Sequence, residues 1–104
     1  MINMIDKIDI IEAKTFKDRL FGLMFKENIN YCLLFKKCNS IHTFFMKEKI
    51  DIVMTDKNNR ILYIKKGLDK NRIILPKKGV YNTYEFPNNF IKDLKINDEL
   101  KIRD

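Results

Sequence analysis

IDIVMTDKNNRILYI, residues 50–64, contains the clearest structural signal of the chain. Two apolar runs, 50–55 and 60–64, flank the polar tetrapeptide 56–59. Isoleucine, valine, threonine and tyrosine favour strands, and the two asparagines of the tetrapeptide tolerate the left-handed backbone angles that tight turns need. The stretch therefore predicts a β-hairpin.

Similar short apolar runs occur on both sides of this hairpin. Each run is bounded by lysine, asparagine, glycine or proline, which are frequent in turns and poor in strands. Their close spacing favours a meander, in which strands that follow one another along the chain also pair with one another. The runs predict strands at residues 8–13, 31–35, 41–46, 73–75, 81–86 and 99–102.

One segment near the amino terminus has helical spacing instead. Its apolar side chains recur at intervals of three and four residues, at Phe16, Leu20, Leu23 and Met24. Residues 16–25 are therefore predicted to form a short helix that lays one apolar stripe on the core, with Thr15 as its N-cap. Gly22 costs about 1 kcal/mol relative to alanine inside a helix, so either the helix ends early or another segment packs closely against it. Residues 90–94 are expected to add a single helical turn.

Together these elements predict a mainly β fold of α+β character. We expect one domain over residues 1–104, built as a small barrel-like antiparallel or mixed sheet with one short helix packed against it. A curled sheet of this kind covers its own edges, and the helix then lies over the opening. The alternative is an open sheet with the helix across one face.

Composition limits the classes of function. The chain has 21 Lys and Arg residues against 14 Asp and Glu, a net charge of +7. No apolar run approaches the roughly 20 residues that cross a bilayer, so we expect a cytoplasmic protein with no membrane partner. Abundant Lys, Asn and Ile with no Trp are typical of a genome poor in G and C, so most lysines are interpreted as solvated surface rather than a nucleic-acid site. The lysine pairs that leave the nucleic-acid alternative open are 36–37, 65–66 and 77–78.

Cysteine and histidine are scarce. Cys32 and Cys38 are expected to stay reduced, because two cysteines are too few for a disulfide framework in a cytosolic chain. Together with His42 they lack the paired spacing of structural zinc sites, so we expect no metal and no cofactor. On one strand, Cys38 and His42 would lie roughly 13 Å apart, too far for a nucleophile and its base unless a turn separates them.

Several polar residues interrupt apolar runs and form the candidate site. If 41–46 is a strand, both of its faces are largely apolar, and His42 is expected to be at least partly buried. Asp51 is costly to bury without a partner. Its candidate partners are Arg19, His42, Thr43 and Glu85. These residues predict either a structural network, led by an Arg19–Asp51 pair, or the floor of a small pocket for a polar or anionic ligand.

Blocks of these residues resemble a known family. The block Ala13-x5-Arg19-x2-Gly22-Leu23-Met24 and the block His42-Thr43-x2-Met46-x4-Asp51 are similar to the two main signatures of the prokaryotic family called domain of unknown function 192. Residues 84–87 and 96–98 resemble weaker blocks near its carboxyl end, whereas residues 47–49 and 88–89 depart from the family pattern. The resemblance implies a compact, β-rich, barrel-like domain with a helix. It implies no established reaction, cofactor or catalytic residue.

Three hypotheses of function follow. The first is a non-catalytic binding or accessory module, which holds a small ligand or a protein partner in a cleft. The second is a hydrolytic or acid–base enzyme that uses His42 with Asp51 or Glu85. The third is nucleic-acid binding through the lysine pairs. The ligand-binding candidates of the first hypothesis are Arg19, His42, Thr43, Asp51 and Glu85.

Overall fold

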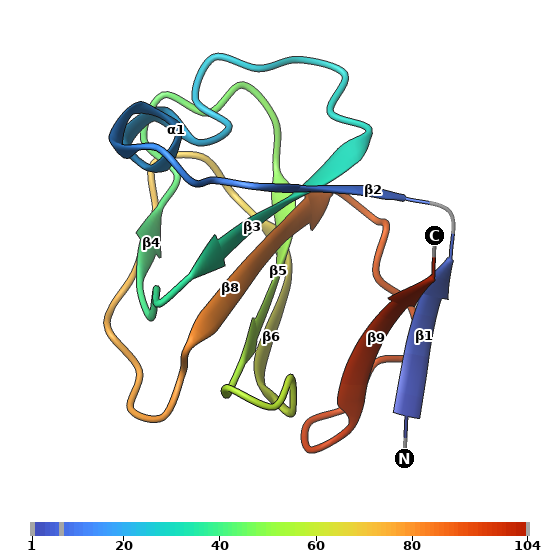
Figure 1. Cartoon of the computed structure of the whole chain (residues 1–104). Coiled ribbons are helices and arrows are strands. Elements are labelled where there is room, and N and C mark those ends of the chain that lie inside the picture. The colour runs from blue at the N-terminus through green and yellow to red at the C-terminus, as the bar shows by residue number, and fades with distance from the viewer. Residues whose placement is uncertain (1, 7, 104) are drawn as a thin grey trace.

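The computed structural model describes residues 2–6 and 8–103 (Figure 1). A single short helix, α1, spans Phe16–Phe21, and the other elements of the described chain are strands. The strands are β1 Ile2–Asp6, β2 Asp9–Glu12, β3 Tyr31–Lys36, β4 Ile41–His42, β5 Ile50–Thr55, β6 Ile61–Leu68, β7 Ile73–Ile74, β8 Asn82–Pro87 and β9 Glu99–Arg103. The predicted mainly β class is confirmed.

Five strands form the central sheet in the order β2-β3-β8-β5-β6. The chain passes from β2 through α1 to β3, and these two strands are parallel, whereas the other neighbours in the sheet are antiparallel. β8 lies between β3 and β5, so the sheet is not the expected meander. The sheet is also open and does not close into a barrel, because β2 and β6 are its edges.

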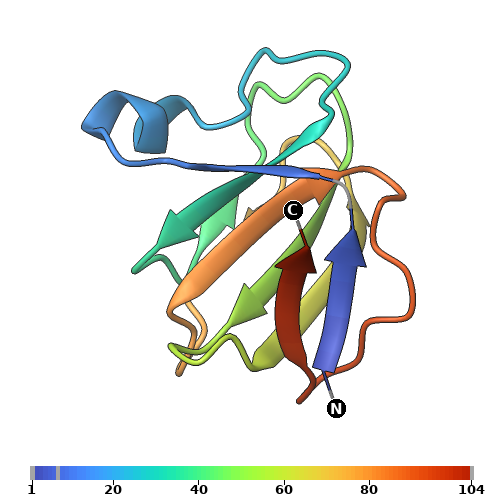
Figure 2. The ribbon, with the colours of Figure 1, turned by 45° about the vertical axis from the view of Figure 1, so that its right-hand side comes forward.

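Two small ribbons flank this sheet. β1 and β9 pair in parallel, and β4 pairs antiparallel with β7. Both views place α1 well away from the β1–β9 ribbon (Figure 1, Figure 2). An isolated antiparallel bridge between Arg60 and Glu99 connects β9 to the β5–β6 hairpin. The β1–β9 ribbon thus adjoins the central sheet without closing it into a barrel.

The central sheet is covered on both faces. Along β3, Leu33 and Phe35 belong to one buried cluster, whereas Cys32 and Leu34 belong to another. Successive strand residues point to opposite faces, so this alternation shows that each cluster lies on its own face of the sheet. The first cluster also contains Leu23, Ile29, Met46, Ile52 and Ile74, and the second contains Val53, Tyr84, Phe86, Ile91 and Leu100.

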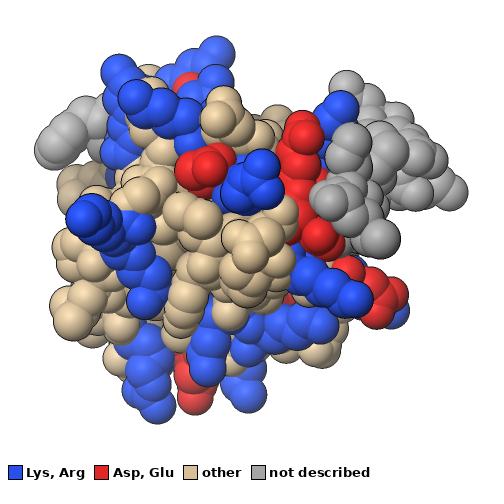
Figure 3. All heavy atoms as spheres, turned by 90° about the horizontal axis from the view of Figure 1, so that it is seen from below, with Lys and Arg blue, Asp and Glu red and all other residues tan. Residues whose placement is uncertain are grey.

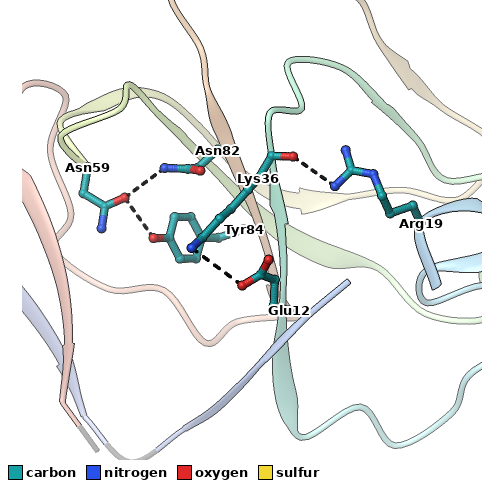
Figure 4. Close-up of polar contacts among 6 residues, drawn as sticks. All are labelled: Glu12, Arg19, Lys36, Asn59, Asn82 and Tyr84. Carbon is teal, nitrogen blue, oxygen red and sulfur yellow. Dashed lines mark hydrogen bonds and ion pairs between the residues drawn. The ribbon is translucent and has the colours of Figure 1, made fainter. Parts of the chain in front are cut away.

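The β5–β6 hairpin forms where the sequence predicts it. Asn59 has a φ of 60°, the left-handed angle expected of a turn asparagine. Asp56 Oδ1 accepts hydrogen bonds from the backbone N–H groups of Asn58 and Arg60, both at 2.9 Å. The Asn59 side-chain oxygen accepts from the Tyr84 hydroxyl at 2.9 Å and fastens the turn to β8 (Figure 4).

Helix α1 begins as predicted and ends early. The Thr15 hydroxyl accepts a hydrogen bond from the Asp18 N–H at 3.0 Å, which makes Thr15 the N-cap. The helix ends at Gly22, whose φ of 51° is open to glycine and strained for other residues. The predicted apolar stripe is therefore wrong: Leu20 is 51% exposed, and Leu23, which follows the helix, is the residue that enters the core.

Two other expectations fail. The strand predicted over 41–46 stops at His42, because Phe45 adopts a φ of 62° and the Met46 N–H donates back to the Thr43 carbonyl in a turn. The two largely apolar strand faces expected for residues 41–46 therefore do not exist. Residues 90–94 form no helical turn. This segment is instead anchored to the sheet by the side chain of Ile91, which is buried in the second cluster.

Candidate functional site

A pocket of about 130 Å³ opens beside the first core cluster. The end of α1 and the turn that follows it form one wall, and the segment 38–42 forms another. Buried apolar side chains of Leu23, Phe35 and Met46 line the interior. Its polar side chains are Arg19, Cys38, Ser40, His42 and Glu85. Three of the five sequence candidates, Arg19, His42 and Glu85, therefore meet in one hollow.

Glu85 is the buried polar group of this pocket. Alternation along β8 places Tyr84 and Phe86 in the second cluster, so Glu85 points to the opposite face, toward the first cluster. Its side chain is 5% exposed, and burial raises the pKa of its carboxyl to about 8. Among the described residues, no hydrogen bond or ion pair reaches this carboxyl group. Glu85 is therefore largely protonated at neutral pH and has a free O–H group.

Gly22 allows the chain to approach this carboxyl group. A Cβ atom built at residue 22 would lie 3.2 Å from Cζ of Phe35 and 4.0 Å from Oε1 of Glu85. Both expectations for this glycine are met, because the helix ends there and another segment packs against its backbone. The glycine thus shapes the pocket wall directly above Phe35.

Arg19 projects from the end of α1 toward β3 and is exposed (Figure 4). Its Nη1 donates to the Lys36 carbonyl at 2.9 Å, and its guanidinium carbon lies 5.9 Å from the centre of the Phe35 ring. The ammonium group of Lys36 pairs with Glu12 at 3.6 Å, which joins β3 to β2 (Figure 4). The bond to the Lys36 carbonyl uses one of the five N–H groups of the guanidinium, so Arg19 is held in place while its other N–H groups can still donate.

His42 ends β4 and is exposed, so the expectation that it is partly buried is wrong. The reason is that β4 is only two residues long and belongs to a small ribbon rather than to the central sheet. The Phe44 N–H donates to His42 Nδ1 at 3.2 Å, and the two rings stack at 5.1 Å. Because Nδ1 accepts, the proton of the neutral ring lies on Nε2, which makes Nε2 a hydrogen-bond donor.

The two cysteines are unpaired and differ in their surroundings. A turn with Lys37 at a φ of 54° separates β3 from residues 38–42, so Cys38 and His42 both line the pocket. The Cys38 thiol donates to the Ser40 carbonyl at 3.1 Å, and within the described chain no bond joins it to His42. Burial first, and then the Glu85 carboxyl, raises the pKa of the Cys32 thiol far above its ordinary range. Cys32 is therefore an unreactive core residue.

Asp51 is buried but does not line the pocket. Asp51 pairs in register with Phe86 and Glu85 with Ile52, so the two carboxyl groups lie on opposite faces of the sheet. Asp51 accepts from the Gly67 N–H at 2.8 Å and from the Ile91 N–H at 3.1 Å. The predicted Arg19–Asp51 pair is wrong, because backbone N–H groups satisfy this carboxylate.

Thr43 is also buried and also lies outside the pocket lining. Its hydroxyl donates to the Asp69 carbonyl at 2.7 Å and accepts from the Arg72 N–H at 2.8 Å. These bonds fasten the turn after β4 to the loop between β6 and β7. Thr43 and Asp51 are thus committed to backbone groups, whereas Arg19, His42 and Glu85 face the pocket.

The structure contributes further pocket residues that sequence reasoning did not propose: Phe35, Cys38 and Ser40. The available signal was Gly22, whose position inside a helical pattern indicated a close approach by another segment. Among the described residues, no group of three or more His, Cys, Asp and Glu side chains is arranged to hold a metal ion.

A second, more open hollow of about 670 Å³ lies beside the β5–β6 hairpin. Three lysines line it, Lys36, Lys57 and Lys101. Several of its polar side chains bond one another, but among the described residues the side-chain oxygen of Asn82 has no hydrogen-bond partner. Asn59 Oδ1 accepts from Tyr84 and from the Asn82 side chain at 3.3 Å (Figure 4). Figure 3 shows one face of the molecule, on which Lys and Arg side chains lie mostly around the outline, with uncharged surface between them.

Fold and pocket together define a small β domain with an open five-stranded sheet and a ligand-sized hollow at the end of its short helix. The family model for domain of unknown function 192, described as an uncharacterized ACR family, matches residues 2–103. The chain belongs to this family. Residues of both signature blocks, Arg19, Gly22 and Met24 from the first and His42 and Met46 from the second, line the pocket.

The chain is also similar to curated proteins of archaea. It is 35% identical to UPF0127 protein TK1120 of Thermococcus kodakarensis, over 83% of this chain and 58% of that protein. It is 35% identical to a UPF0127 protein of Thermococcus sibiricus, over 85% and 62% of the two chains, and to UPF0127 protein PH1112 of Pyrococcus horikoshii, over 86% and 83%. The chain thus spans about three fifths of the length of the two Thermococcus relatives.

Two solved structures share the fold. A protein of unknown function from Novosphingobium aromaticivorans superimposes with a TM-score of 0.69 at 13% identity, covering 79% of this chain and 64% of the other. A candidate transcription regulator from Sinorhizobium meliloti superimposes with a TM-score of 0.67 at 14% identity, covering 78% and 69%. At such identities the likeness concerns the fold alone. Within the described residues, no helix is long and apolar enough to cross a membrane.

Proposed function

We propose that this domain is a non-catalytic binding module that holds a small molecule in the pocket at Glu85. The observation that carries the proposal is that Glu85 is only 5% exposed as a residue and that its carboxyl group has no hydrogen-bond or ion-pair partner among the described residues. Burying a polar group without a hydrogen bond costs roughly 1–3 kcal/mol on protein scales. Such a group at a hollow with apolar walls is typical of a site completed by its ligand.

The contacts favour binding over catalysis. A general base needs a reacting proton within about 3 Å and a partner that orients it. His42 is oriented by the backbone of Phe44. In the described chain, neither Asp51 nor Glu85 hydrogen-bonds to the His42 ring. We therefore rank the acid–base enzyme below the binding module.

The setting of the module is part of the proposal. We infer that it works in the cytoplasm, where the unpaired thiols of Cys32 and Cys38 stay reduced, and that its ligand is a small molecule rather than nucleic acid. On the face shown in Figure 3, the Lys and Arg side chains lie mostly at the margin and uncharged surface occupies much of the middle. This supports the second point for that face, because nucleic-acid binding proteins gather their cations on one face.

The test is a fragment screen by NMR on the full chain, read from backbone amide shifts. We expect saturable shifts confined to the pocket residues. Ser40→Phe places a ring in the pocket wall and should abolish them. Asn39→Phe places the same ring on the exposed neighbouring residue, outside the pocket lining, and should leave them unchanged. Fragments that bind both variants equally, or no fragment bound at millimolar concentration, would overturn the proposal.

A further inference from the structure

The polar groups that face the pocket are mostly hydrogen-bond donors, and this indicates the chemistry of the ligand. The argument rests on the proposed function, since it concerns the same pocket. Arg19 keeps free N–H groups after its bond to the Lys36 carbonyl. A guanidinium carries its positive charge throughout the physiological pH range, so it favours an anion at the mouth of the pocket.

His42 adds a second donor of defined orientation. Its Nδ1 accepts from the Phe44 N–H, so Nε2 carries the proton of the neutral ring. The stacking of the His42 ring on Phe44 at 5.1 Å holds the ring in place. A ligand acceptor group can therefore bond to Nε2–H without competition from the backbone contact.

Glu85 adds a third donor, deeper in the pocket. Because the Glu85 carboxyl group is buried and has no partner among the described residues, it keeps its proton. A hydrogen bond from an O–H group to a carboxylate oxygen is one of the stronger hydrogen bonds in proteins. The thiol of Cys38 is already committed to the Ser40 carbonyl. Three donors, one of them cationic, thus face the hollow, and the complementary group is an acceptor with negative charge.

The walls and the volume limit the rest of the ligand. The interior is lined by Leu23, Phe35 and Met46, which favour an apolar body. A cavity of about 150 Å³ in another protein holds one benzene molecule, so a hollow of about 130 Å³ accepts a body of that size or slightly smaller.

We propose that the pocket binds a small monocarboxylate whose apolar body is no larger than one six-membered ring. The body contacts Leu23, Phe35 and Met46, and the carboxylate accepts from Arg19, His42 and the protonated Glu85. Binding then requires the Glu85 proton.

This requirement predicts a pH dependence. With a pKa of about 8, Glu85 is about nine-tenths protonated at pH 7 and about one-tenth protonated at pH 9. Since only the protonated fraction binds, affinity should fall about tenfold over this range. The other titratable or charged groups near Glu85 are Tyr31 on its own face of the sheet, Cys32 on the opposite face, Arg19 on α1, and Cys38 and His42 beside the pocket. Because Glu85→Gln keeps all of them, it isolates the contribution of Glu85.

The experiment uses calorimetry with three probes of one shape on the full chain. Benzoate, benzamide and benzamidine carry charges of −1, 0 and +1 on the same ring. We expect benzoate to bind at least tenfold more tightly than either of the others at pH 7, and about tenfold more weakly at pH 9. In Glu85→Gln, the benzoate affinity should be the same at both pH values.

Arg19→Gln provides the second test. It should weaken benzoate binding at least fivefold. Arg60→Gln is the matched control, because Arg60 is also exposed and its Nη1 also donates to a backbone carbonyl, that of Asn97 at 3.1 Å, away from the pocket. The control should change benzoate affinity by less than twofold. Circular dichroism and the melting temperature show that each variant folds.

The outcomes separate this inference from the proposed function. If benzamide or benzamidine binds as tightly as benzoate, or if fragments bind at the pocket but benzoate does not, the carboxylate class is wrong and the binding module stands. An unchanged benzoate affinity in Arg19→Gln would also overturn the class. If neither the probes nor the fragment screen gives binding at the pocket, both proposals fail.

Discussion

Asp51 and Glu85 are buried carboxyl groups on neighbouring strands of one sheet, yet their surroundings differ. Asp51 on β5 faces the second core cluster and accepts two backbone hydrogen bonds. Glu85 on β8 faces the other side of the sheet, where it has no partner among the described residues and borders the pocket. The comparison teaches that burial alone does not identify a site. A carboxylate that the backbone satisfies maintains the architecture, whereas one left open beside a hollow is free to meet a ligand.

The donors to Asp51 explain why this carboxylate is structural. Ile50 pairs with Leu68 and Ile52 pairs with Lys65, so Asp51 alone lies opposite two residues of β6, 66 and 67. β6 therefore has a bulge opposite Asp51. Gly67 lies in this bulge with a φ of 61°, and its N–H donates to Asp51. The second donor, Ile91, belongs to the segment between β8 and β9. Asp51 thus holds a distorted edge strand and a long connection against the sheet.

The largest expected effect concerns the pH dependence of stability at Glu85. The folded state keeps a proton with a pKa of about 8 that the unfolded chain releases near 4.5. Between these values, stability therefore falls as pH rises, by up to about 5 kcal/mol in total. Urea titrations from pH 4.5 to 8.5 measure the free energy of unfolding of the protein and of Glu85→Gln. As pH rises, the variant should become increasingly more stable than the unsubstituted protein. Parallel pH profiles would show that Glu85 is ionised in the folded state.

The next effect tests the structural role of Asp51. Asp51→Ala leaves two buried N–H groups without an acceptor and should lower the free energy of unfolding by about 3 kcal/mol. The matched control is Asp56→Ala, which also removes an acceptor of two backbone N–H groups, but at a hairpin where water replaces it. We expect a loss of about 1 kcal/mol there. Equal losses in urea titrations would remove the distinction between the two sites.

A smaller effect is expected at the pocket wall. Gly22→Ala introduces a Cβ at a positive φ and 3.2 Å from Cζ of Phe35, so the ring must shift. We expect a loss of about 2 kcal/mol, measured by thermal unfolding. Gly79→Ala separates the two causes, because Gly79 also has a positive φ but its added Cβ would meet its nearest neighbour at an ordinary 3.5 Å. If Gly22→Ala loses no more stability than Gly79→Ala, the Phe35 ring moves away from the added Cβ without a measurable cost.

The smallest effect is expected for Arg19. Its side chain is exposed, so Arg19→Gln should lower stability by less than about 1 kcal/mol, as should Arg60→Gln. Chemical denaturation measures both. A loss of several kcal/mol in Arg19→Gln would place Arg19 with Asp51 among the structural residues, rather than with Glu85 at the pocket.

Local patterns were sufficient for much of this fold. The hairpin turn at 56–59, the strands around it and the start of α1 at Thr15 depend on residues a few positions apart, whose preferences a sequence expresses directly. The candidate residues were also identifiable, because Arg19, Asp51 and Glu85 interrupt apolar runs. Where α1 ends was left open, since a glycine in a helix is compatible with several outcomes.

Only the tertiary structure separated Asp51 from Glu85. Their faces depend on the strand register between β5 and β8, which are distant in the sequence, and a slip of one residue would exchange the two faces. The short β4 and the exposed His42 likewise follow from the turn at Phe45 and from pairing with β7. Residue types along the chain thus established which side chains need a partner. The partners themselves were decided by pairing between distant segments, because hydrogen bonds and burial form only when those segments meet.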